Sequence, residues 1–98
     1  MNCTFPNVRD GRKVVAAAGT AERLVASNTS CRKVTIMAEL DNSDYVVIGD
    51  STVVAALATR RGIPLSAGTS ITLDIEDLYT IFVDSVVNGE GVTFIYQF

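Results

Sequence analysis

The fold of this chain is decided by residues 70–98, SITLDIEDLYTIFVDSVVNGEGVTFIYQF, in which apolar and polar side chains alternate. The alternation is clearest in three runs, residues 71–75, 79–83 and 92–98. Residues that are two positions apart point to the same face of a β-strand, so each run predicts a strand with one buried face. Upstream, residues 34–38 repeat the pattern, with Met37 as the exception.

The rest of the chain predicts further short strands, separated by turn-forming clusters such as Asn28-Thr29-Ser30. The run 45–48 is continuously apolar, which indicates a strand buried on both faces. Residues 52–59 are ambiguous, because alanines allow a helical turn whereas Thr and Val prefer a strand. Residues 88–91, NGEG, predict a hairpin loop before the last strand. The expected strands are 13–18, 21–27, 31–40, 45–48, 63–65, 70–75, 78–84 and 92–98.

Seven or eight short strands without a long helix predict an all-β fold, an antiparallel sandwich or barrel. A chain of 98 residues is long enough for one domain with its own core, which we place at residues 12–98. Residues 1–11, MNCTFPNVRDG, are rich in turn formers and predict an extended N-terminal arm. Because the arm also carries Phe5 and Val8, we expect it to dock on a neighbouring protein or to fray.

The composition is apolar for so small a domain. Hydrophobic residues make up 48% of the chain and charged residues 19%, against a typical ~25% charged. Two explanations stay open: a well-filled core, or an apolar outer surface that another subunit covers. The longest apolar run, residues 53–58, is far shorter than a bilayer span, so we expect no membrane partner.

The charges argue against nucleic acid as a partner. The net charge is −3, and six of the eight basic residues form the adjacent pairs Arg12-Lys13, Arg32-Lys33 and Arg60-Arg61. Neighbouring residues of a strand point to opposite faces, so these pairs do not build one basic face. We expect Arg60 and Arg61 to meet acidic groups of a protein partner.

No group of residues predicts catalysis or a cofactor. The chain has no histidine, the commonest general base and metal ligand. Asp74 and Glu76 share a strand face, but the opposite face is apolar, so a solvated surface is the better interpretation than a catalytic pair. The loop 41–44 lacks the spacing of a calcium site and its closing Glu. Cys3 and Cys31 have neither zinc nor redox spacing, and whether they form a disulfide stays open.

Four pieces of residues 21–98 resemble a group of small virion proteins of tailed phages: AERLVASNTSCRKVTIMAE, NSDYVVIGDSTV, GIPLSAGTSITLDIEDLYTIFVDS and NGEGVTFIYQF. A Val-x-Ile strand precedes an Asn-rich turn and a short apolar strand that ends in Gly. A Pro-Leu-x-x-Gly turn at 64–68 then leads to a Leu-Asp-x-x-Asp-Leu corner at 73–78.

The resemblance implies a non-enzymatic structural role in a virion, after synthesis in the host cytoplasm. A head decoration (cement) protein that bridges major capsid subunits is the first hypothesis. We expect such a protein to form homo-oligomers and to bind through Phe5, Val8, Arg60 and Arg61. The alternative is a tail or fibre component that recognises a host glycan. Aromatic side chains in loops would favour that alternative, but Tyr45, Tyr79 and Tyr96 all fall in expected strands.

Overall fold

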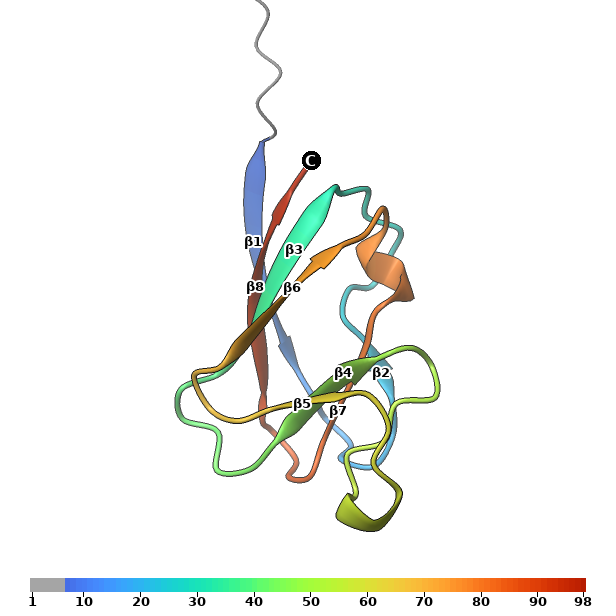
Figure 1. The fold of residues 1–98 in the computed structure, drawn as a ribbon, viewed down its shortest axis with the longest axis vertical. Helices are drawn as coiled ribbons and strands as arrows, with labels where there is room; N and C mark the ends of the chain where they lie inside the picture. Colours follow the sequence, from blue (N-terminus) through green and yellow to red (C-terminus); the bar gives the residue numbers. More distant parts are fainter. Residues whose placement is uncertain (1–6) are drawn as a thin grey trace, which may run out of the picture.

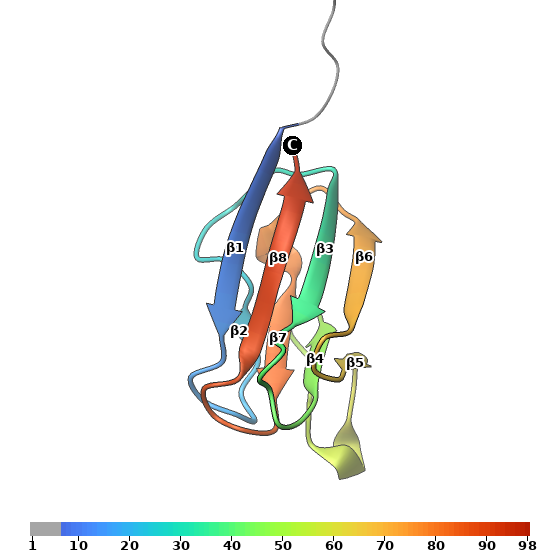
Figure 2. The same cartoon turned by 90° about the vertical axis from the view of Figure 1, so that its left-hand side faces the viewer.

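The computed structural model describes residues 7–98, which form eight strands in two antiparallel four-stranded sheets (Figures 1 and 2). Sheet A contains, in spatial order, β1 (Val8–Val14), β8 (Gly91–Gln97), β3 (Lys33–Ala38) and β6 (Ser70–Asp74). Sheet B contains β2 (Glu22–Arg23), β7 (Phe82–Ser85), β4 (Val46–Gly49) and β5 (Ile63–Leu65). The predicted all-β antiparallel fold is confirmed, and within residues 7–98 the sheets form an open sandwich rather than a closed barrel.

The strands pair from the two ends of the chain inward. β1 pairs with β8, β2 with β7, β3 with β6 and β4 with β5, all antiparallel. The chain therefore has the arrangement of one long hairpin folded into two layers, which is the topology of a jelly roll. Every connection except β4–β5 crosses from one sheet to the other. The prediction of a hairpin at residues 88–91 is therefore wrong, because this loop joins strands of different sheets.

The first strand begins earlier than the sequence predicted. β1 starts at Val8 and pairs with β8 along its whole length, whereas residues 15–20 lie outside any strand. The expectation of an arm over residues 1–11 is therefore wrong for residues 8–11, and Phe5 lies outside the described residues. Gly11 makes the pairing possible, because a Cβ at this position would overlap the ring of Phe94.

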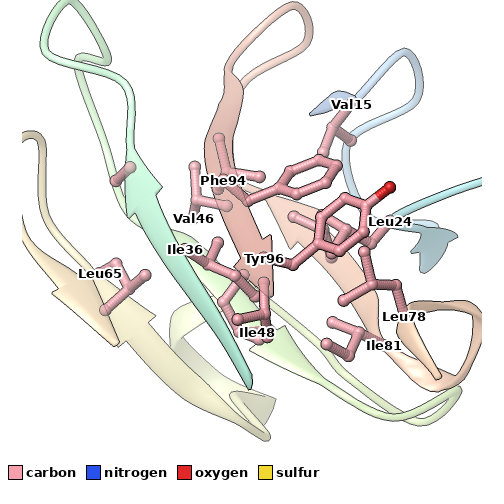
Figure 3. Close-up of a cluster of buried hydrophobic side chains, with 14 of the residues drawn as sticks. Val15, Leu24, Ile36, Val46, Ile48, Leu65, Leu78, Ile81, Phe94 and Tyr96 are labelled. Carbon is pink, nitrogen blue, oxygen red and sulfur yellow. The ribbon is translucent and has the colours of Figure 1, made fainter. Parts of the chain in front are cut away.

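The core fills the space between the two sheets (Figure 3). Sheet A contributes the predicted alternating residues of β3 and β8, and sheet B contributes Val46, Ile48, Leu65 and Val83. The predicted strand 78–84 is interrupted at its start, because Leu78–Thr80 form a short 3₁₀ helix, η2. The ambiguous segment also ends in such a helix, η1 (Leu57–Thr59).

Candidate interaction surfaces

The outer face of sheet B is covered by the chain itself. Residues 50–62, which connect β4 to β5, fold over this face and bring Val53 and Ala55 onto Val47. Val47 is thereby buried although it points away from the main core. This cover explains why β4 is apolar on both of its faces, as the sequence predicted.

A buried carboxylate holds the cover in place. Asp84 of β7 is completely buried on the outer side of sheet B. Its Oδ2 accepts a hydrogen bond of 2.9 Å from the amide of Ala55, and its Oδ1 accepts one of 2.9 Å from the amide of Gly19. The sequence analysis did not single out Asp84, although a lone acid in the apolar run of β7 is a signal of a buried polar role.

The acids that the sequence did single out do not converge on one site. Asp74 and Glu76 are exposed, and the carboxylate of Asp74 lies 3.6 Å from the Nζ of Lys33. Asp77 caps η2, with its side chain accepting the amide of Tyr79 at 2.9 Å and the Nδ2 of Asn28 at 2.7 Å. The bond from Asn28 and the amides that Asp77 accepts lower the pKa of this carboxyl. The role of Asp77 is therefore to organise the β6–β7 connection.

The loop 41–44 is held by Glu90, from the connection between the two sheets. The Glu90 carboxylate accepts hydrogen bonds from the amide and hydroxyl of Ser43 and from the amide of Asp44. These bonds, that of the Ser43 amide first, lower the pKa of Glu90. Nearby, the Asn42 side chain donates to the carbonyl oxygen of Gly91 at 2.9 Å and accepts from the Gly91 amide at 3.3 Å.

Metal-binding groups do not cluster in the described part of the chain. Within residues 7–98, no set of three or more His, Cys, Asp or Glu side chains is placed to hold a metal ion. Cys31 is buried, and its thiol donates to the carbonyl oxygen of Ile75 at 3.1 Å. Burial raises the pKa of this thiol.

The residues that were predicted to bind a partner lie apart from one another. Val8 is in β1, with its side chain on the outer face of sheet A and 57% exposed. Arg60 turns back onto its own loop, where its Nε donates to the carbonyl oxygen of Ala55 and its guanidinium lies over the Tyr45 ring. Arg61 is exposed and lines a shallow hollow with Gly49 and Asp50.

The most apolar concavity lies on the open side of the sandwich, where both sheets end. A groove of about 300 Å³ separates the edge strand β6 from β4 and β5. Its floor is formed by Ile48 and Ile81, which are buried, and its rim by Ile63, which is 51% exposed. The remaining apolar lining comes from the core-facing side of β6 and the residue that follows it: Ile71, Leu73 and Ile75.

The outer face of sheet A is bare, and no other segment of residues 7–98 lies over it (Figure 2). Ile95 stands at its centre and is 48% exposed, with Thr35 beside it on β3 and Asp10 beside it on β1. Met37 is also exposed on this face. The strand alternation predicted the outward residues of β3 and β8 but not those of β1, because residues 1–11 were expected to form an arm.

A third hollow, of about 390 Å³, lies beside Tyr45 and is lined by polar side chains of the 41–44 loop together with Ser66 and Ala67. Tyr45 precedes β4 and is 42% exposed, and Tyr79 lies in η2. The prediction that all three tyrosines fall in strands is therefore wrong for Tyr45 and Tyr79. Only Tyr96 lies in a strand, on the core face of β8.

Comparisons with protein-family models, with curated proteins and with solved structures gave no match. Among residues 7–98, the structure contains no helix with the length and apolar character needed to cross a membrane.

Proposed function

We propose that the chain is a structural protein of a tailed-phage particle, a head decoration protein that binds and bridges major capsid subunits. The resemblance of four segments within residues 21–98 to small virion proteins of tailed phages suggests this role. The jelly-roll topology adds support, since viral capsid domains use it, although the same topology also serves lectins and enzymes. The argument for adhesion therefore comes from the surface rather than from the fold.

The groove between β5 and β6 is the observation that carries the proposal. Six of its nine lining residues are isoleucine or leucine, and the strands on its two sides are the free edges of sheets A and B. A free edge offers backbone N–H and C=O groups to an added strand, and the groove offers space for every second side chain. The occupant that fits is an extended apolar segment of a capsid subunit.

A charged contact at the end of the groove completes the site. The hollow lined by Arg61 shares Gly49 and Asp50 with the groove, so Arg61 lies close to the end of the groove. An acidic residue that flanks the apolar capsid segment would pair with Arg61. Because the exposed pair contributes at most about 1 kcal/mol, the apolar contacts dominate and the charge sets the direction of binding.

The test is the occupancy of the protein on purified particles, measured by quantitative mass spectrometry against the major capsid protein. A copy number comparable to that of the capsid protein supports a decoration protein, and a handful of copies contradicts it. Ile63→Glu places a charge at the groove rim and should lower occupancy at least tenfold. Leu57→Glu is the matched control, because Leu57 is 82% exposed and lies outside the groove. Equal occupancy of both variants would rule out the groove.

The hollow beside Tyr45 favours a second candidate function, a tail or fibre protein that binds a host glycan. Sugar rings pack on aromatic side chains, and their hydroxyls need polar partners of the kind that line this hollow. In that case Tyr45→Ala should abolish binding on a glycan array and leave the melting temperature of the domain within a few degrees of wild type. A low copy number per particle together with glycan binding would replace the decoration proposal by this one.

A further inference from the structure

The outer face of sheet A has the pattern of a self-complementary surface. Its outward side chains form rows across the strands, in the order β1, β8, β3, β6. One row is Asp10, Ile95, Thr35 and Thr72, and the next is Arg12, Thr93, Met37 and Ser70. The centre of the face is uncharged, and the charges stand at its margins.

A second copy can be placed by a two-fold axis that lies in the plane of the face, perpendicular to the strands and midway between these two rows. Each row of one copy then lies over the other row of the second copy. Asp10 of one copy then faces Arg12 of the second copy, and Arg12 faces Asp10. On β3 the same operation places Lys33 opposite Glu39. No like charges face each other across the strand rows. A two-fold interface requires this kind of self-complementarity, because the same patch serves both partners.

Arg12 can serve a partner without giving up its contact inside its own chain. Its Nε and one Nη donate to the carboxylate of Glu39, at 2.9 and 3.2 Å. A guanidinium has five N–H donors, so others remain for Asp10 of the second copy. The Arg12 side chain is 61% exposed, and a partner can therefore reach it.

The shape of the face agrees with this arrangement. Ile95 is half-exposed at the centre, and it borders a hollow of about 430 Å³ whose lining also includes Thr93 of β8, Met37 of β3 and Gly11 of β1. The two-fold operation places Ile95 of each copy over Thr93 of the other, next to this hollow. Sheets that pack face to face lie about 10 Å apart and interdigitate their side chains, so Ile95 enters the hollow.

We propose that two copies of this chain associate through the outer faces of sheet A, with antiparallel strands and with Asp10 paired to Arg12 across the interface. The face measures about four strands of ~4.8 Å by about seven residues of ~3.3 Å, on the order of 400 Å² per copy. A standard interface buries ~800 Å² per partner, so the isolated dimer is weak and its effect grows when many copies assemble. The association is independent of the groove and of any capsid contact.

Sedimentation equilibrium of the purified full chain tests the proposal, with the protein taken up to about 1 mM. Wild type should show a reversible monomer–dimer equilibrium. Asp10→Arg alone brings arginine against Arg12, and Arg12→Asp alone brings aspartate against Asp10, so each should raise the dissociation constant at least tenfold. An equal mixture of the two variants restores opposite charges at both contacts and should form a heterodimer with near wild-type affinity.

The control, Glu76→Arg, makes the same kind of charge change elsewhere. Glu76 lies beyond the end of β6, so this variant should dimerise like wild type. A wild type that stays monomeric throughout overturns the proposal, as do single variants that still dimerise or a mixture that stays monomeric. None of these results bears on particle occupancy, so this inference and the proposed function fail separately.

Discussion

The two sheets of this jelly roll have the same number of strands, but the outer face of sheet A is bare and the outer face of sheet B is covered. Sheet A has strands of five to seven residues and a bare outer face with Ile95 at its centre. Sheet B has strands of two to four residues and an outer face that residues 50–62 cover. Long strands with one bare face can offer a surface to a partner, whereas short strands need their cover to bury enough apolar area.

This difference separates the residues that we expect to matter for folding from those that we expect to matter for self-association. The cover of sheet B depends on Asp84, a single buried carboxylate. The outer face of sheet A depends on nothing beyond its own strands, so substitutions there should alter association rather than folding. Four experiments test this division and the packing behind it.

The largest effect on the cover of sheet B should follow from Asp84→Ala. The change leaves the buried amide of Ala55 without a partner and removes the acceptor of the more exposed Gly19 amide. An unsatisfied buried amide costs roughly 1–3 kcal/mol and the Gly19 amide adds less, so we expect about 2–4 kcal/mol in total. Urea denaturation measures the loss. Hydrogen exchange locates it: the amide of Ala55 should exchange much faster, while amides of β3 keep more of their protection. A loss below about 1 kcal/mol would show that the cover does not need this carboxylate.

The second test compares two residues that the sequence places on core-facing strand sides. Ile81 is confirmed as buried, at 3% exposure, whereas Leu73 is only half-buried because it lines the open groove. Ile81→Ala should cost about 2–5 kcal/mol and Leu73→Ala about 1–2 kcal/mol, because truncating a half-buried side chain removes less apolar packing and leaves no closed cavity. Equal costs in urea denaturation would mean that the groove is closed in solution.

The comparison of the sheets also shows what the sequence could predict. Alternation identified the core-facing and outward residues of β3, β6 and β8, because period two depends only on local geometry. It could not predict that Leu73 lies at an open edge, since the neighbour that a strand lacks is a long-range property. The start of β1 at Val8 was missed for the same reason: Asp10 and Gly11 favour a turn locally, and pairing with β8 overrides that preference.

The candidate surfaces show the same contrast between what the local sequence predicts and what depends on long-range contacts. Val8 was chosen for its apolar character, but its place on the bare face follows from the register of β1 against β8. Arg60 and Arg61 looked equivalent as neighbours, yet the guanidinium of Arg60 binds its own loop at Ala55. The hollow beside Tyr45 exists because two residues far away in the sequence hold the 41–44 loop: the Glu90 carboxylate binds Ser43, and the Gly91 carbonyl accepts from Asn42.

Acid should loosen the connection between the two sheets. The pKa values of Glu90 and Asp77 are lowered in the folded state, so their contributions are complete above the unfolded carboxyl pKa of roughly 4 and are lost as the pH falls through the folded values. The urea midpoint should therefore fall below about pH 4.5. In Glu90→Gln the fall should be shallower, and the two proteins should converge in stability at low pH. A constant difference between them from pH 7 to pH 3 would contradict the role of the Glu90 charge.

The smallest loss of stability should come from Asp74→Asn, on the bare outer face of sheet A. Asp84→Asn makes the same chemical change under the cover of sheet B and serves as the comparison. The Asp74 side chain is 83% exposed and that of its partner Lys33 50% exposed, and the two groups are 3.6 Å apart. Water solvates both groups when the pair is lost, so the expected cost is less than about 0.5 kcal/mol. Asp84→Asn keeps one acceptor oxygen but places an amide NH₂ against backbone donors, so it should cost several times more. If paired urea curves gave equal losses, burial would not separate the two outer faces, and the contrast between a covered sheet B and a bare sheet A would not hold in solution.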